Sequence, residues 1–283
     1  MIFCVDMDAF FASVEKASKP HLKDKPVAVI GAKERTVVTT ACYIARKYGV
    51  KTGMSKYEAE KMCPFINMVV GNNRKYTYIS SQIMDFFKTL TDKVEVYSVD
   101  EAFLQIPDEE AVDAIVDIKN YVKKHFGITC SVGAGKSKLV AKMASGINKP
   151  DGSLVISDDK TIDFLDSFKL EDIWGIGKKL SERFYNTGVF NTADIRKLGR
   201  EKLCKMFGKN GHYYYMMAYG DDREGIRVED ETVKSIGHSM TFPEDVRDTR
   251  MFNAYLLQLC EMVSGRARRH NVSGRTIVLS IRF

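Results

Sequence analysis

The order of strand-like and helix-like segments places the strongest constraint on the fold of this chain. "IFCVD", residues 2–6, is apolar like a buried strand, and a segment with helical spacing follows it. Amphipathic helices over 76–92 and 109–125 flank the strands "VEVYSV" and "EAFLQI", and "TCSVGAG" is a further strand. Strand-helix-strand-strand-helix-strand predicts a ferredoxin-like α+β unit.

The rest of the chain divides around this unit. Residues 11–72 interrupt it with two more strands, "KPVAVIG" and "RTVVTTA", and the short helix "YIARKYGV". Residues 161–232 read as short helices joined by glycine turns. Residues 233–283 again alternate strand and helix, with strand-like "SIGHSMTF" and "RTIVLSIRF" on either side of one helix. We therefore expect an α+β multidomain protein whose ferredoxin-like unit comprises residues 1–10 and 73–160.

The charge of the chain is mildly basic and is concentrated toward its end. Lys and Arg number 43 against 37 Asp and Glu, a net charge of +6, and residues 233–283 hold eight basic against four acidic side chains. This distribution favours an anionic partner. The scattered cysteines argue against a zinc or disulfide framework. An acid already at Asp6 argues against a signal peptide, and no apolar run approaches the length of a membrane span, so we expect a cytoplasmic protein.

Two adjacent acids, Asp100 and Glu101, interrupt the otherwise apolar run "YSVDEAFLQI". Successive side chains of a strand point to opposite faces, so both can aim at one point only at a hairpin corner. If the strand that ends at Asp6 is a neighbour, three carboxylates converge and need cations between them. Hard oxygen ligands suit Mg²⁺, and two such ions could activate a hydroxyl and stabilise a leaving phosphate oxygen. The alternative is a set of acids at unrelated, solvated turns.

Two basic or polar helices could bind phosphate. In "TTACYIARKYG", helical spacing would put Thr40, Tyr43 and Arg46 near one face, with Thr40 at the helix N-terminus, where anions are favoured. In "GKSKLVAKMASGINKP", Lys138 and Lys142 share a face. An amphipathic surface helix and ordinary solvated lysines are the respective alternatives.

The segment "LEDIWGIGKKLSERFYNTGV" has the pattern of a helix-hairpin-helix, which holds the DNA backbone without reading sequence. Gly175 and Gly177 would form the turn, because glycine has no Cβ to keep a phosphate from the backbone N–H groups. Lys178 and Lys179 would flank that phosphate. A plain glycine connection between helices is the alternative, and we expect Trp174 to be a packing residue.

Taken in order, these motifs resemble the Y-family, or translesion, DNA polymerases of the DinB/UmuC type. The likeness runs through essentially the whole chain: "VDMDAFFASVE", "TTACYIARKYGVKTGM", "YSVDEAFL", "SVGAGKSKLVAKMASGINKPDG", "IWGIGKKL" and "KSIGHSMTFPEDV". The resemblance implies a right-hand architecture with a ferredoxin-like palm (1–10 and 73–160), small fingers (11–72) and a helical thumb with the helix-hairpin-helix (161–232). Residues 233–283 would form a partial, truncated little finger, since its second strand-helix-strand half is not in this sequence.

The resemblance also implies a function and a site. The chain would be a DNA-directed DNA polymerase of low fidelity that adds deoxynucleotides past damaged template bases. Asp6, Asp100 and Glu101 would be the catalytic acids and, with the main-chain carbonyl of Met7, would hold two Mg²⁺ ions. Phe11 would be the steric gate against a ribonucleotide's 2′-hydroxyl. The residues that match the family's triphosphate-binding positions are Thr40, Tyr43, Arg46 and Lys149. Asp8 matches the pattern but is not counted as a metal ligand.

The implied partners are primer-template DNA, deoxynucleoside triphosphates and a sliding clamp, the last through a segment absent from this sequence. The implied oligomeric state is a monomer.

Two other functions would each explain some of these residues. A two-metal nucleotide cyclase would explain the acids, although the Gly-Ile-Gly turn and the basic tail argue against it. A non-catalytic DNA-binding protein would explain the helix-hairpin-helix and an incomplete little finger.

Overall fold

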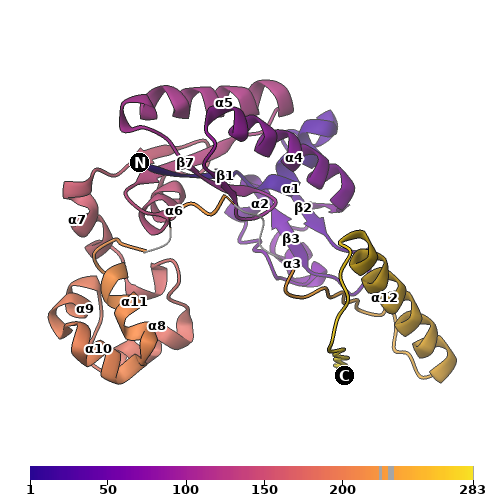
Figure 1. Cartoon of the computed structure of the whole chain (residues 1–283). Coiled ribbons are helices and arrows are strands. Elements are labelled where there is room, and N and C mark those ends of the chain that lie inside the picture. The colour runs from indigo at the N-terminus through magenta and orange to yellow at the C-terminus, as the bar shows by residue number, and fades with distance from the viewer. Residues whose placement is uncertain (223–224, 229–232, 283) are drawn as a thin grey trace.

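A five-stranded sheet forms the largest unit of the computed structural model, which describes residues 1–222, 225–228 and 233–282 (Figure 1). Its strands lie in the order β5 (Val94–Val96), β6 (Glu101–Gln105), β1 (Ile2–Met7), β7 (Cys130–Gly135) and β8 (Ser153–Val155). β1 is antiparallel to both of its neighbours, and β8 runs parallel to β7. This confirms the predicted ferredoxin-like order; the three-residue β8 was not predicted.

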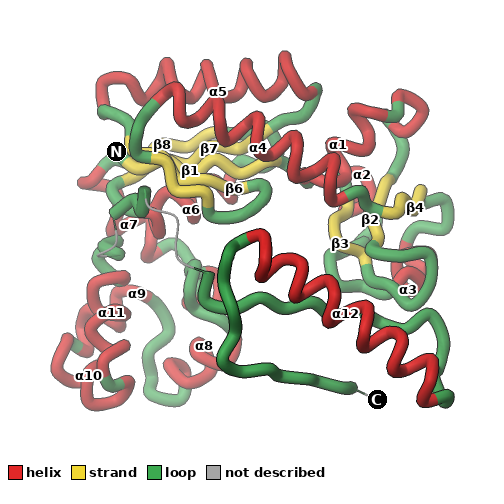
Figure 2. The backbone as a smooth tube through the Cα atoms, turned by 45° about the vertical axis from the view of Figure 1, so that its right-hand side comes forward, coloured by secondary structure: helices red, strands yellow, loops and turns green. Residues whose placement is uncertain are grey.

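Helices cover both faces of this sheet. α4 (Asn73–Leu90) and α5 (Ala111–Phe126) lie over one face, and α6 (Lys138–Ile147) lies on the other (Figures 1 and 2). Gly133 in β7 allows α6 to come this close, because a Cβ there would lie 2.1 Å from both the Ala141 oxygen and the Ser145 nitrogen. The close contact places the side chains of α6 over the centre of the sheet.

A smaller second sheet lies beside the first (Figure 2). It has the order β3 (Val38–Ala41), β2 (Val27–Ile30), β4 (Asn67–Val70), and carries α1 (Phe10–Ser18), α2 (Tyr43–Lys47) and α3 (Lys56–Met62). β2 and β3 are the two predicted strands, whereas α3 and β4 were not predicted. One hydrophobic core runs through both sheets and includes Val5 of β1 and Val27 of β2.

Short helices make up a separate bundle after residue 160, as predicted. They are α7 (Thr161–Asp166), α8 (Lys178–Tyr185), α9 (Thr192–Leu198), α10 (Arg200–Phe207) and α11 (Lys209–Met217). The bundle has its own core, which includes Leu165, Phe184 and Leu203. Trp174 connects it to the large sheet, since its ring lies 5.9 Å from that of Phe103. The predicted end of this region, residue 232, lies outside the described residues.

The C-terminal segment differs from its prediction. The central helix is present as α12 (Thr249–Arg269), but residues 235–242 and 275–282, which are all described, form no strand. A strand is stabilised by a paired neighbour and a buried face, and these segments have neither: Ile277 is 96% and Val278 80% exposed. Phe283 lies outside the described residues. No helix in the described part of the chain is long and apolar enough to span a bilayer.

Candidate active site

The hairpin between β5 and β6 brings the acidic doublet to the end of β1. Asp6 and Glu101 are directly opposite each other in the antiparallel ladder, where Cα atoms lie about 4.5–5.5 Å apart. The Met7 amide donates a hydrogen bond of 2.9 Å to the Asp100 carbonyl, and the Ser98 amide closes the turn onto the Glu101 carbonyl at 3.1 Å. The hairpin corner that the doublet required is therefore present.

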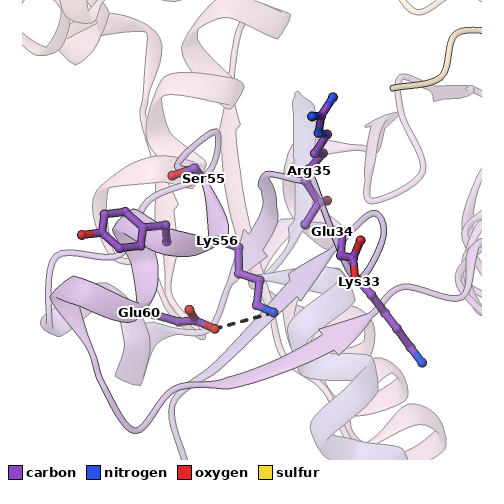
Figure 3. A pocket seen from close by; sticks show the side chains of 8 residues that line it. Lys33, Glu34, Arg35, Ser55, Lys56 and Glu60 are labelled. Carbon is purple, nitrogen blue, oxygen red and sulfur yellow. Dashed lines mark ion pairs between the residues drawn. The ribbon is translucent and has the colours of Figure 1, made fainter. Parts of the chain in front are cut away.

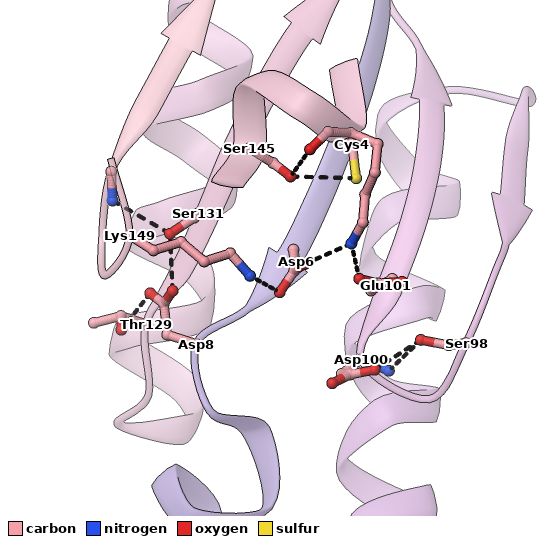
Figure 4. A network of polar contacts seen from close by, with 12 residues as sticks. Cys4, Asp6, Asp8, Ser98, Asp100, Glu101, Thr129, Ser131, Ser145 and Lys149 are labelled. Atoms are coloured by element: carbon pink, nitrogen blue, oxygen red, sulfur yellow. Dashed lines mark hydrogen bonds and ion pairs between the residues drawn. The ribbon is translucent and has the colours of Figure 1, made fainter. Parts of the chain in front are cut away.

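Two lysines neutralise these acids (Figure 4). Lys142 Nζ lies 2.8 Å from Asp6 Oδ2 and also contacts Glu101 Oε1, while Lys149 Nζ contacts Asp6 Oδ1. The side chains of Asp6 and Glu101 are only 9% and 17% exposed. Water therefore screens these carboxylates little, and the ammonium groups supply the positive charge that they need.

Lys142 is the site residue that the sequence did not single out. Helical spacing grouped it with Lys138, but Lys138 forms an ion pair of 3.0 Å with Glu95 instead. One helical turn separates the two lysines, so Lys138 reaches Glu95 on β5 and Lys142 reaches the acids at the ends of β1 and β6. The sequence signal that α6 packs closely on β7 is the pair of glycines in "SVGAG", just before the helix.

The third acid is oriented differently. The Asp100 carboxylate accepts a hydrogen bond of 2.7 Å from Ser98 Oγ, and Figure 4 shows it apart from Asp6 and Glu101. Among the described residues, no three His, Cys, Asp or Glu side chains are grouped as a metal site. The predicted convergence thus holds for Asp6 and Glu101 but not for the Asp100 side chain, because its carboxylate binds the Ser98 hydroxyl of the hairpin instead.

The donor set nevertheless fits a divalent cation. The groups at the ends of β1 and β6 are carboxylate and carbonyl oxygens, which are the ligands that Mg²⁺ prefers. Asp6 and Glu101 already contact positively charged groups from two different parts of the chain. The residues present are therefore of the right chemistry to hold Mg²⁺.

Asp8 is fully used as a hydrogen-bond acceptor and is 1% exposed. It accepts bonds from Ser131 Oγ at 2.8 Å, Thr129 Oγ1 at 2.7 Å, the Asp151 amide at 2.7 Å and the Tyr43 hydroxyl at 3.3 Å. Burial, together with the negative charge of Asp8, raises the pKa of Tyr43 to about 12. Asp8 thus orients the phenol of Tyr43.

The phosphate-binding segment is only partly as predicted. Thr40 lies in β3, opposite Val29, rather than at a helix N-terminus, because the residues before Cys42 pair with β2. The helix begins at Tyr43, and the Arg46 guanidinium lies 4.7 Å from the centre of the Tyr43 ring. The spacing argument was therefore wrong for Thr40, although it placed Tyr43 and Arg46 correctly on one face.

Phe11 and the glycine turn are both in positions open to a ligand. Phe11 is in the first turn of α1, half-buried, with its ring stacked on that of Tyr76. Gly175 has a φ of +93°, which favours glycine, and Gly177 immediately precedes α8. Lys178 and Lys179 are exposed at the start of that helix.

A separate hollow of about 360 Å³ lies on the small sheet (Figure 3). Its lining residues are Lys33, Glu34, Arg35, Thr36, Ser55, Lys56, Tyr57 and Glu60. None of the predicted site residues is among them. Charges of both signs line it, and Lys56 and Glu60 are paired at 3.8 Å.

Comparison with known proteins identifies the family. The model of the impB/mucB/samB family matches residues 5–146, its C-terminal domain matches 233–283, and the family's HHH motif matches 158–189. A DNA polymerase IV of Bacteroides fragilis is 35% identical over all of this chain and 79% of its own length. The chain belongs to the impB/mucB/samB family. A DNA polymerase IV of Staphylococcus aureus is 37% identical to this family member, over 99% of the chain and 80% of the relative.

Solved structures agree with this membership. A Y-family DNA polymerase chimera of Dbh and Dpo4 matches 94% of this impB/mucB/samB protein with a TM-score of 0.84 and 31% identity, over 80% of the chimera. DinB from Sulfolobus solfataricus matches the same share of both chains with a TM-score of 0.73 and 30% identity. The fold is that of a Y-family polymerase. Family membership favours the polymerase hypothesis over the cyclase and the non-catalytic alternative.

Proposed function

We propose that this Y-family enzyme performs translesion, DNA-directed DNA synthesis at the acids on the ends of β1 and β6. One observation carries the proposal: Asp6 and Glu101 are opposite in the ladder and hold the ammonium group of Lys142 between them. The phenol of Tyr43 reaches the same end of β1 through its hydrogen bond to Asp8. The acids Asp6 and Glu101, which require cations, thus lie near Tyr43, in the segment that we expect to bind phosphate.

In this proposal Asp6, Asp100, Glu101 and the main-chain carbonyl of Met7 would hold two Mg²⁺ ions. Such ions would lower the pKa of the primer 3′-hydroxyl and supply positive charge to the leaving pyrophosphate. Asp100 would have to give up its hydrogen bond from Ser98 to take this role. The half-buried setting of the acids keeps water from weakening these interactions.

The incoming nucleotide is held by Thr40, Tyr43, Arg46 and Lys149. Tyr43 donates a hydrogen bond to a phosphate oxygen, since its phenol is a hydrogen-bond donor. Arg46 adds a guanidinium with several donors on the same face of α2. Phe11 is the steric gate, which rejects the 2′-hydroxyl of a ribonucleotide by occupying its space.

For the domains, we propose the residue ranges expected from the sequence. We assign the palm to 1–10 and 73–160, the fingers to 11–72, the thumb to 161–232 and a partial little finger to 233–283. Gly175, Gly177, Lys178 and Lys179 contact the DNA backbone, a role supported by the matched HHH motif. Primer-template DNA and deoxynucleoside triphosphates are the substrates, and the enzyme acts as a cytoplasmic monomer.

Primer extension on undamaged and abasic templates tests this proposal. Changing both Asp100→Ala and Glu101→Ala should lower the extension rate by more than about 100-fold, because even outer partners of metal ligands contribute 10- to 100-fold. A matched control changes Glu109→Ala and Glu110→Ala, two exposed acids after the next turn, and should extend primers like wild type. Wild-type speed in the first double variant would contradict the proposal.

A further inference from the structure

The Phe11 ring rests on a second aromatic ring. Its centre lies 4.4 Å from that of Tyr76, and the two planes are inclined by only 16°. Tyr76 is in the first turn of α4 and is 1% exposed, whereas Phe11 is only half-buried. Tyr76 is therefore the inner, fixed member of the stack, and Phe11 is the member that a nucleotide could touch.

A buried carboxylate holds Tyr76 in place. The Tyr76 hydroxyl donates a hydrogen bond of 2.9 Å to Glu15 Oε1, and Glu15 is itself 1% exposed. Glu15 lies four residues after Phe11 in α1, so both side chains leave the helix on the same face. Phe11, Tyr76 and Glu15 thus form a continuous row from the helix surface into the core.

Two lysines keep that carboxylate charged. Lys75 Nζ lies 2.6 Å from Glu15 Oε1, and Lys19 Nζ lies 2.9 Å from Oε2. Burial alone would raise the pKa of Glu15, but hydrogen bonds from Lys75, Lys19 and Tyr76 lower it overall. The Tyr76 hydroxyl therefore donates to an ionised acceptor, a bond stronger than one between neutral groups.

We propose that Glu15 and Tyr76 are positioning residues that fix the Phe11 ring and so set the discrimination between deoxyribonucleotides and ribonucleotides. The inference rests on the proposed role of Phe11 as the steric gate. A 2′-hydroxyl could enter only by displacing the Phe11 ring, and that ring can retreat only against Tyr76. Moving Tyr76 would break its bond to a buried, charged acceptor, so the strength of that bond adds to the resistance of the gate.

The test compares kcat/KM for a ribonucleoside triphosphate with that for the deoxyribonucleotide of the same base. Tyr76→Phe keeps the stacked ring and removes only the hydroxyl, and it should raise the ribo/deoxy ratio about threefold to tenfold, as expected from one lost hydrogen bond. Glu15→Gln keeps an acceptor and should raise the ratio less. Tyr78→Phe, on the same helix but 65% exposed, is the matched control and should leave it unchanged.

A ratio measured within one preparation is not affected by a variant that folds poorly, because inactive protein lowers both rates equally. Phe11→Ala should raise the ratio more than Tyr76→Phe, and the variant with both changes should equal Phe11→Ala alone, because Tyr76 acts through Phe11.

An unchanged ratio in Tyr76→Phe, beside a raised one in Phe11→Ala, would overturn the positioning role and leave the gate intact. Additive effects of the two changes would overturn it as well. An unchanged ratio in Phe11→Ala would instead refute the proposed gate itself.

Discussion

Replacing Lys142 by Met removes the ammonium group that joins Asp6 to Glu101 and keeps an unbranched side chain of similar length. In the structure, Lys142 Nζ contacts both carboxylates, and Lys149 contacts only Asp6. After the change, Glu101 loses its lysine partner and Asp6 keeps one. We therefore expect the metal-free protein to be less stable.

The magnitude follows from how far the groups are buried. Breaking a fully buried pair destabilises a protein by about 3–5 kcal/mol, whereas an exposed pair contributes about 0–1 kcal/mol. The side chains of Lys142, Asp6 and Glu101 are 20%, 9% and 17% exposed, between these limits. Because Lys149 still neutralises Asp6, we expect the free energy of unfolding to fall by about 1–3 kcal/mol, within that range.

Urea unfolding at 25 °C, followed by far-UV circular dichroism in EDTA and at increasing Mg²⁺, measures this effect. If bound Mg²⁺ takes the place of the ammonium group, the deficit of Lys142→Met should shrink as Mg²⁺ rises. Its apparent Mg²⁺ affinity should then exceed that of wild type by about 5- to 150-fold, the same free energy expressed as coupling. The matched control Lys136→Met changes an exposed lysine just before α6 and should alter stability by less than about 0.5 kcal/mol.

The reasoning has two possible refutations. Equal stability of Lys142→Met and wild type in EDTA, with equal Mg²⁺ midpoints, would show that the ammonium group does not neutralise the acids. A deficit that stays constant at saturating Mg²⁺ would show that Lys142 stabilises the fold independently of any cation.

Three further predictions concern the thumb. Changing both Lys178→Ala and Lys179→Ala should weaken primer-template binding on all sequences and lower the salt slope of the binding constant by about one to two, measured by fluorescence anisotropy; an unaltered slope would exclude phosphate contacts. Gly175→Ala should lower thermal stability by about 1–2 kcal/mol, because φ is +93° there; an unchanged midpoint would contradict this. Burial alone would raise the pKa of Asp166, but the Arg196 hydrogen bond lowers it overall. Asp166→Asn should therefore be destabilised at pH 7 and lose that deficit as pH falls through the depressed folded pKa, in urea titrations; a deficit independent of pH would argue against the ion pair.

The large sheet was predictable because each of its central strands is marked by local pattern. β1, β6 and β7 are continuous apolar runs, and α4 and α5 have helical spacing over four turns or more. The doublet of Asp100 and Glu101 located the hairpin corner, since two acids in an apolar run require a bend. Short elements such as β8, with three residues of which two are exposed, have too few positions to show a period.

The candidate site was less predictable, because its partners come from different elements. Thr40 fits helical spacing, yet pairing with Val29 makes it part of a strand; tertiary contacts decide between the two. Lys138 and Lys142 are equivalent in the pattern, and only the position of each helical turn along the sheet brings one to the acids and the other to Glu95. The Asp100 carboxylate binds the Ser98 hydroxyl, a contact that spacing alone does not specify.

The C-terminal segment also shows that a local pattern does not determine structure without tertiary contacts. Its helix α12 buries none of its residues within the described part of the chain, and Phe242, which precedes the helix, stacks on Tyr255 of α12 with 4.7 Å between the ring centres. The ion pair of Arg35 with Asp245 links it to the fingers, but these side chains are 46% and 75% exposed, so the pair contributes about 0–1 kcal/mol. Because so little energy fixes the segment against the small sheet, a duplex bound along its basic residues could reposition it at low cost. The alternating pattern of residues 275–282 then describes a capacity to pair, which a strand realises only when a neighbour is in place.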